Sequence, residues 1–161
     1  MKINGIVGLK PRIVSLVLPL SDDTQVEFKF RPLTSDDDFE KVLAQPTPPE
    51  RIIKGGARIK DYEDAGYKAA ILKWSGQRND WSMLKSMSET DDLEFETVKS
   101  DDPETWGNWK KEFDAIFGDN ALGRVYIAYA DANSLSEDTL EKARKSFLAS
   151  RQAAAENLSA F

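Results

Sequence analysis

The strongest constraint on the fold of this chain is a change of hydrophobic period near residue 33. Over residues 26–30 apolar side chains alternate with charged ones, which is the pattern of a β-strand with one face in water. Residues 13–18, rich in β-branched residues and leucine, precede them, and residues 21–24 have the Ser and Asp side chains typical of turns. We therefore predict a β-hairpin from about Arg12 to Leu33. Pro19 cannot donate a ladder hydrogen bond, so we expect it at a strand end or on an edge.

Beyond residue 33 the apolar residues recur at helical spacing. Thr34 or Ser35 can cap a short helix with Phe39, Val42 and Leu43 on its buried face. Longer helices are predicted at about residues 61–87, 102–117, 120–132 and 134–148, with a short third strand or an extended loop at 93–97. The predicted fold class is therefore α+β, an N-terminal β-hairpin followed by a mainly helical bundle of four to five helices.

Four tryptophans stand at helical spacings within these patterns, and we predict that they are mainly core residues. They are Trp74, Trp81, Trp106 and Trp109. With 161 residues, of which 40% are hydrophobic, the chain can bury a core without any covalent staple. We expect one α+β domain over residues 1–151 and a frayed tail at 152–161.

The absence of histidine and cysteine excludes several kinds of chemistry. A Ser-His-Asp triad, a Cys/His nucleophile pair, an imidazole or thiolate metal site and a disulfide framework all need these residues. The remaining carboxylates, lysines, tyrosines and hydroxyls show no recognised catalytic spacing. We therefore predict no catalytic residue, no metal site and no cofactor, and a protein that is not an enzyme.

Two acidic stretches invite a functional interpretation. Residues 36–38 are three consecutive aspartates, but at a helix start the helix dipole explains them, and neighbouring side chains point in different directions. Residues 91–102 carry six acids, which suit a solvated loop, a cation site, a docking strip for a basic partner or a mimic of nucleic-acid charge. The net charge of −6 argues against a dedicated duplex-DNA binder.

One basic island interrupts this acidic chain after a proline-rich stretch. Residues 50–60 are predicted to form a loop around Gly55-Gly56, without the sequence of a phosphate-binding P-loop. A purely solvated loop does not need isoleucines, so we predict a mobile segment that contacts a protein partner. The candidate contact residues are Arg51, Ile52, Ile53, Lys54, Arg58, Ile59 and Lys60.

The order of these segments resembles that of the tail assembly chaperones of tailed bacteriophages. The resemblance covers most of residues 12–151, and the segments that carry it are 26–34, 46–49, 94–98, 103–109 and 132–148. It implies a non-enzymatic protein that binds the hydrophobic tape measure protein, and the tail tube protein, while the tail assembles. It also implies a location in the host cell cytoplasm, which agrees with an N-terminus too short and broken for a signal peptide and with the absence of a long apolar run.

Two other functions remain open at this point. One is a different virion part, such as a head–tail connector or completion protein, which would form a homo-oligomeric ring. The other is an acidic inhibitor of a host nuclease or defence complex, which would use residues 91–102. Under every interpretation we expect no membrane partner and no direct contact with nucleic acid.

Overall fold

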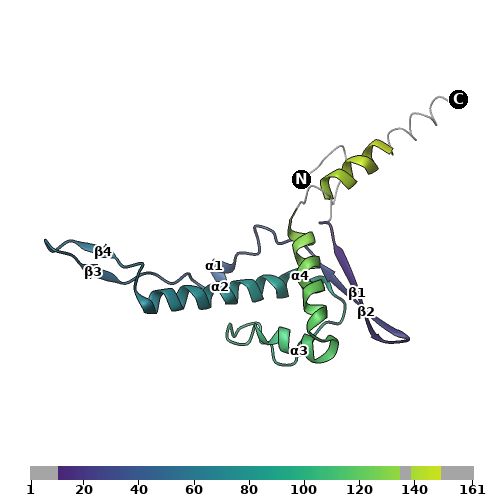
Figure 1. Ribbon diagram of the computed structural model, residues 1–161, viewed down its shortest axis with the longest axis horizontal. Coiled ribbons are helices and arrows are strands. Elements are labelled where there is room, and N and C mark those ends of the chain that lie inside the picture. The colour runs from purple at the N-terminus through teal and green to yellow at the C-terminus, as the bar shows by residue number, and fades with distance from the viewer. Residues whose placement is uncertain (1–10, 135–138, 150–161) are drawn as a thin grey trace.

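The structure is a computed structural model, and it describes residues 11–134 and 139–149. One long helix, α2 (Ala65–Ser86), is the axis of the molecule. Its C-terminal end is packed among two β-strands and the other helices of the body, whereas its N-terminal end carries a separate small hairpin far from them (Figure 1). The predicted tail at 152–161 lies outside the described residues.

The predicted N-terminal hairpin is confirmed. Strands β1 (Val14–Ser21) and β2 (Thr24–Phe30) pair antiparallel, with Val14 opposite Phe30 and Leu16 opposite Phe28. Pro19 lies in β1, which is an edge strand because this sheet has only two strands, and the register shifts between Pro19 and Ser21. The alternation therefore gives the sheet one apolar face and one face in water.

The helices largely follow the predicted order. Helix α1 (Phe39–Val42) is only one turn long, and its N-cap is Asp38, whose carboxylate accepts a hydrogen bond from the Glu40 amide; the predicted caps Thr34 and Ser35 are wrong. Helix α2 begins after Asp64, which accepts a hydrogen bond from the Tyr67 amide, and a 3-10 turn, η1 (Met87–Glu89), follows it. Helices α3 (Asn108–Phe117) and α4 (Asp119–Asn133) come next, and residues 139–149 are helical.

The segment between η1 and α3 follows the prediction in part. Of the two structures predicted for residues 93–97, the extended loop is confirmed and the strand is wrong. The loop is held by the Glu112 carboxylate, which accepts hydrogen bonds from the Glu96 and Thr97 amides at 2.7 Å each. Residues 103–107 form turns, so α3 begins at Asn108 and not at the Asp102-Pro103 signal. Gly118 ends α3 as predicted, with a positive φ of 76° that favours glycine.

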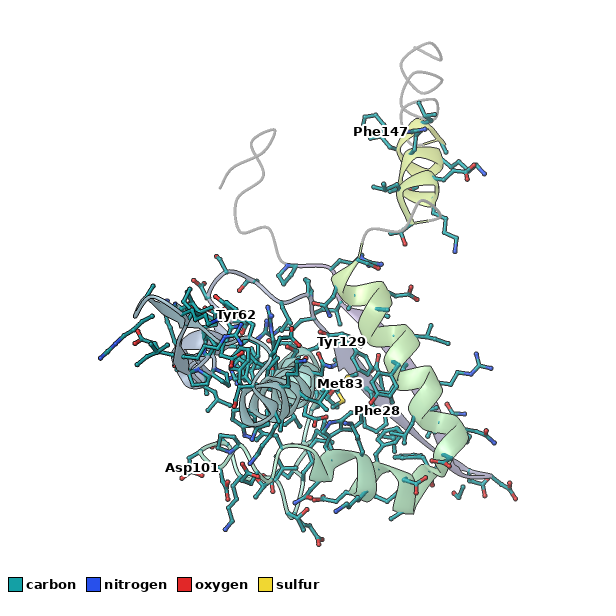
Figure 2. All side chains as sticks on the ribbon, turned by 60° about the vertical axis from the view of Figure 1, so that its left-hand side comes forward. Phe28, Tyr62, Met83, Asp101, Tyr129 and Phe147 are labelled. Atoms are coloured by element: carbon teal, nitrogen blue, oxygen red, sulfur yellow. The ribbon has the colours of Figure 1, made fainter. Side chains whose placement is uncertain are left out.

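The larger buried cluster lies between the apolar face of the β1–β2 sheet and three helices. Phe28 and Phe30 of β2 contact the C-terminal end of α2 and the inner faces of α3 and α4, and Met83 of α2 lies beside Phe28 (Figure 2). Trp109 of α3 is fully buried here, and its indole N–H donates to the Asp80 carboxylate at 3.1 Å. That carboxylate also pairs with Lys110 at 2.6 Å, so the buried acid is neutralised locally.

A second cluster on another side of α2 is almost entirely aromatic. Phe39 of α1 lies against Trp74, Trp81 and Trp106, with ring centroids 5.3 to 6.1 Å apart. The four tryptophans are 0 to 8% exposed, so the prediction that they are core residues is confirmed. Phe39 thereby fixes the one-turn helix α1, which is too short to be stable alone.

Replacing Phe28 or Trp109 by alanine is expected to lower the free energy of unfolding by about 3–5 kcal/mol each, because both large side chains are buried. Val17→Ala is the matched control, since Val17 is half exposed on β1 and should change stability by no more than about 0.5 kcal/mol. Urea denaturation followed by circular dichroism measures all three. A Phe28 or Trp109 variant as stable as the Val17 variant would contradict this core.

Acid should weaken the fold partly through Asp37. The Arg31 guanidinium donates to its carboxylate at 2.6 and 2.8 Å, with both side chains mostly buried, and this holds the pKa of Asp37 well below its usual range. A lowered pKa adds stability at neutral pH that is lost as the pH falls below about 4.

Asp37→Asn should therefore cost roughly 3 kcal/mol at pH 7 and should flatten the loss of stability in acid. Asp36→Asn is the control, because the Asp36 side chain is exposed and makes no hydrogen bond to the described residues. The measurement is the free energy of unfolding by urea between neutral and acidic pH. If the Asp37 variant follows the wild-type pH profile, the ion pair does not contribute as described.

Candidate partner-binding surface

The predicted contact segment is a β-hairpin, and the prediction of a loop was wrong. Strands β3 (Glu50–Ile52) and β4 (Arg58–Lys60) pair antiparallel as a separate two-stranded sheet. The Ile53 amide extends the pairing by donating to the Ala57 carbonyl at 3.0 Å, and the Asp61 amide closes the base by donating to the Pro49 carbonyl at 2.7 Å. Because these strands are short and fully exposed, their residues show no sustained alternation between apolar and polar, and the sequence therefore did not predict a strand here.

A glycine pair makes the tip of this hairpin. The Gly56 amide donates to the Ile53 carbonyl at 3.0 Å, which closes a four-residue turn with Lys54 and Gly55 at its centre. Gly55 and Gly56 have φ values of 102° and 81°, a region that other residues rarely adopt. The glycines therefore specify the reversal of the chain.

All six residues of β3 and β4 are exposed, and the hairpin contributes no residue to either buried cluster. Ile52, Ile53 and Ile59 are 71, 40 and 37% exposed. The pairing sets Ile59 beside Arg51 on one face and Ile52 beside Arg58 on the other. The structure thus brings all seven predicted contact residues together, with apolar side chains available on both faces.

The hairpin also differs from the body in charge. Residues 50–60 contain four bases and one acid, whereas the whole chain has 22 basic and 28 acidic residues. Arg58 lies 3.6 Å from Glu50 and Arg51 lies 3.8 Å from Asp61, long separations between exposed groups that stabilise little. Lys54 and Lys60 form no ion pair with the described residues. The hairpin is a basic, apolar projection from an acidic molecule.

The two acidic stretches are partly used within the fold. In the first, Asp37 binds Arg31 and Asp38 caps α1. In the second, Asp91 pairs with Lys29 and the Asp102 carboxylate accepts a hydrogen bond from the Glu104 amide. Over residues 11–134 and 139–149 no three His, Cys, Asp or Glu side chains converge in a way that could hold a metal ion.

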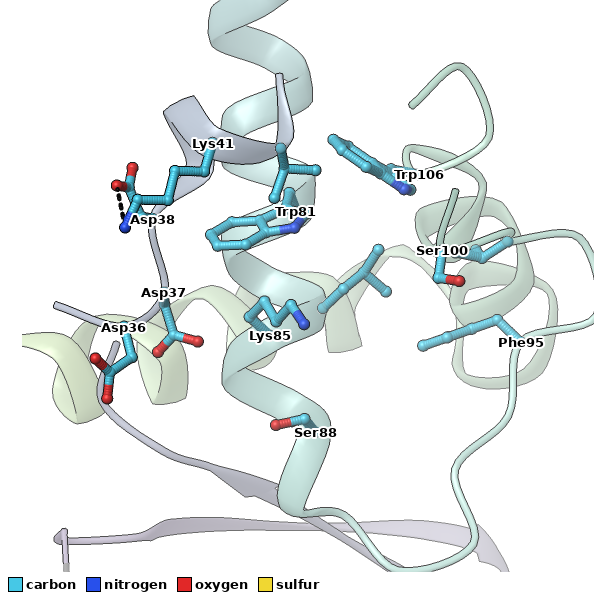
Figure 3. A pocket seen from close by; sticks show the side chains of 13 residues that line it. Asp36, Asp37, Asp38, Lys41, Trp81, Lys85, Ser88, Phe95, Ser100 and Trp106 are labelled. Carbon is cyan, nitrogen blue, oxygen red and sulfur yellow. Dashed lines mark ion pairs between the residues drawn. The ribbon is translucent and has the colours of Figure 1, made fainter. Parts of the chain in front are cut away.

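A pocket of about 530 Å³, which was not predicted from the sequence, lies beside the C-terminal half of α2 (Figure 3). Its apolar lining comes from Val42, Trp81, Leu84, Phe95, Val98 and Trp106. Charged side chains surround it, namely Asp36, Asp37, Asp38, Lys41 and Lys85. The only signal in the sequence was the pair Trp81 and Lys85, one helical turn apart on α2, because the other walls come from segments distant in the chain.

Further apolar side chains are exposed on the later helices. Ile116 of α3 and Tyr126 and Ile127 of α4 are 62, 47 and 57% exposed. On the helix at 139–149, Leu140 and Leu148 are 40 and 58% exposed. These residues are scattered or lie on one face of a helix, whereas the hairpin combines apolar exposure with a distinct charge and a projecting position (Figure 1).

Comparison of the chain with protein-family models, with curated proteins and with solved structures finds no match. In the described part of the chain, no helix combines the length and the apolar character that crossing a membrane requires.

Replacing Gly55 and Gly56 together by alanine should open the hairpin without unfolding the body. A non-glycine residue at positive φ costs roughly 1–2 kcal/mol, and the hairpin has no core contact to offset this. Hydrogen exchange should become faster over residues 50–60, while the urea midpoint stays unchanged. Gly76→Ala, in α2 with no atom near the added Cβ, is the control. A drop in the urea midpoint of the double variant would contradict a structurally separate hairpin.

Proposed function

We propose that this protein is a non-enzymatic tail assembly chaperone of a tailed bacteriophage, which binds the tape measure protein and tube subunits in the host cytoplasm during tail morphogenesis. The observation that carries the proposal is the β3–β4 hairpin, which projects from the body and exposes Ile52, Ile53 and Ile59 among basic side chains. The order of sequence segments that resembles this family supplies the identity of the partner.

The hairpin suits a transient partner contact for three physical reasons. Exposed isoleucines provide apolar area to bury, and their position on both faces lets a long partner contact either side. The basic side chains speed the encounter with a partner and keep the apolar residues soluble. The open edges of β3 and β4 offer backbone groups to an extended segment.

The acidic inhibitor would use residues 91–102. Asp91 and Asp102 of this stretch are engaged within the fold, which leaves four of its six carboxylates for a basic partner, so salt-sensitive binding to a basic host protein would test this alternative. The connector alternative requires a homo-oligomeric ring, and the mass of the purified protein in solution separates it from a chaperone that acts in smaller assemblies.

Replacing Ile52, Ile53 and Ile59 together by serine should weaken the solubilisation of the tape measure protein by at least several-fold and leave the urea midpoint unchanged, because these side chains are outside the core. The experiment co-expresses the chain with the tape measure protein of the same phage and measures the soluble fraction of that partner. Leu72→Ser is the control, since Leu72 is 76% exposed on α2 and lies outside the hairpin.

Two results would contradict the proposal at different levels. If the triple variant solubilises the partner as well as wild type does, the hairpin is not the contact site. If the wild-type protein never increases the soluble fraction, the chaperone function itself is wrong.

A further inference from the structure

The pocket beside α2 contains two hydrogen-bond donors without acceptors. Of the four tryptophans, Trp74, Trp106 and Trp109 donate their indole N–H to oxygens at 3.0 to 3.1 Å. The Trp81 indole N–H makes no hydrogen bond to any described residue, although the side chain is only 7% exposed. Because every fully buried side-chain nitrogen and oxygen in residues 11–134 and 139–149 has a partner, the Trp81 N–H is at least partly open to solvent, and Trp81 is one of the residues that line the pocket.

The second donor is the Lys85 ammonium group. It lies 5.7 Å from the centre of the Trp81 ring, and it forms no ion pair with the described residues. Figure 3 shows the nitrogens of Trp81 and Lys85 on the side of α2 that faces Phe95 and Ser100 across the pocket. An indole N–H and an ammonium group side by side suit a carboxylate oxygen, because both donate and one carries positive charge.

The charges around the pocket favour a peptide over a small anion as the ligand. Asp37 is neutralised by Arg31, and Asp38 lies 3.3 Å from Lys41. This leaves the exposed carboxylate of Asp36 at one edge and the Lys85 ammonium beside Trp81. A small anion would gain from Lys85 but would meet the field of Asp36, whereas a peptide can direct an acidic side chain at Lys85 and its backbone amides at Asp36.

The apolar lining of the pocket favours a ligand with bulky apolar groups. Six apolar side chains line the pocket, and its volume of about 530 Å³ is within the range of roughly 300–1,000 Å³ found for ligand sites. Val42 is 49% exposed at this site, so part of the apolar lining is open to water in the free protein. Covering it releases that water, and this favours binding.

We propose that this pocket binds a segment of a protein partner in which an Asp or Glu stands next to bulky apolar side chains. The acidic side chain accepts hydrogen bonds from the Lys85 ammonium and the Trp81 indole, and the apolar side chains cover Val42, Leu84 and Phe95. The site is separate from the β3–β4 hairpin, which lies at the other end of α2 (Figure 1). It therefore does not depend on the tape measure protein being the partner of the hairpin.

The test is selection of a displayed random peptide library against the purified protein. Peptides enriched by the wild type should carry an acidic residue beside a bulky apolar one. Their affinity should fall at least tenfold for Lys85→Glu and for Val42→Asp, two changes at exposed side chains that should leave the fold intact. Lys111→Glu and Leu72→Asp are the matched controls, because they make the same changes at exposed positions outside the pocket, and they should bind as wild type does.

Tryptophan fluorescence provides the second measurement. A selected peptide should change the emission of the wild type, and Trp81→Phe, which keeps an aromatic ring but removes the N–H, should bind more weakly with a smaller change. The proposal is overturned if the wild type enriches no peptide, or if enriched peptides bind Lys85→Glu as tightly as wild type. It is also overturned if light scattering shows that the wild type self-associates through the pocket and Val42→Asp does not, since a second copy would then be the occupant.

Discussion

The joint between the end of β2 and the end of α2 is the contact on which the rest of this structure depends. The Arg31 amide donates to the Ser86 carbonyl at 2.8 Å, and the Ser86 hydroxyl donates back to the Arg31 carbonyl at 2.7 Å. Thr90 makes the same kind of exchange with the backbone of Lys29. Because these bonds satisfy buried polar groups, they fix the sheet against the helix in one arrangement. The Arg31 guanidinium also donates to the Asp37 carboxylate, just before α1, and this contact holds α1 in position. Phe39 of α1 then completes the aromatic cluster.

This joint divides α2 into two parts with different roles. Its C-terminal half has the sheet cluster on one side and the aromatic cluster on another, and the pocket opens beside that aromatic cluster. Its N-terminal half carries Leu72, the most exposed large apolar residue of the described chain, and ends at the β3–β4 hairpin. A helix of 22 residues is about 33 Å long, so the two candidate contact sites are held well apart. A single extended partner could contact both, and two partners could bind without competition.

The parts of the fold that could be predicted from sequence are mainly those in which buried side chains recur at the spacing of a strand or a helix. The alternation at residues 26–30 and the tryptophan spacings reflect side chains that meet a core, whereas the stop at Gly118 reflects a positive φ that favours glycine, and the structure confirms all three. The hairpin at 50–60 was predicted as a contact segment from its isoleucines but not as strands, because none of its strand residues is buried. The start of α3 was missed because residues 103–107 form turns, in which the Trp106 indole donates to the Lys99 carbonyl. The pocket could not be predicted, since three segments distant in sequence form it.

The separation of the hairpin from the core has a consequence for proteolysis. Opening the hairpin costs only its own strand pairing, whereas cutting inside α2 or the sheet requires the whole body to unfold. Arg51, Lys54, Arg58 and Lys60 are exposed cleavage positions for a protease that cuts after basic residues. The segment that the proposed function uses is thus also one that a protease can reach in the free protein. A bound partner that covers the hairpin would protect the chain, so the lifetime of the protein in the cell would follow the supply of its partner.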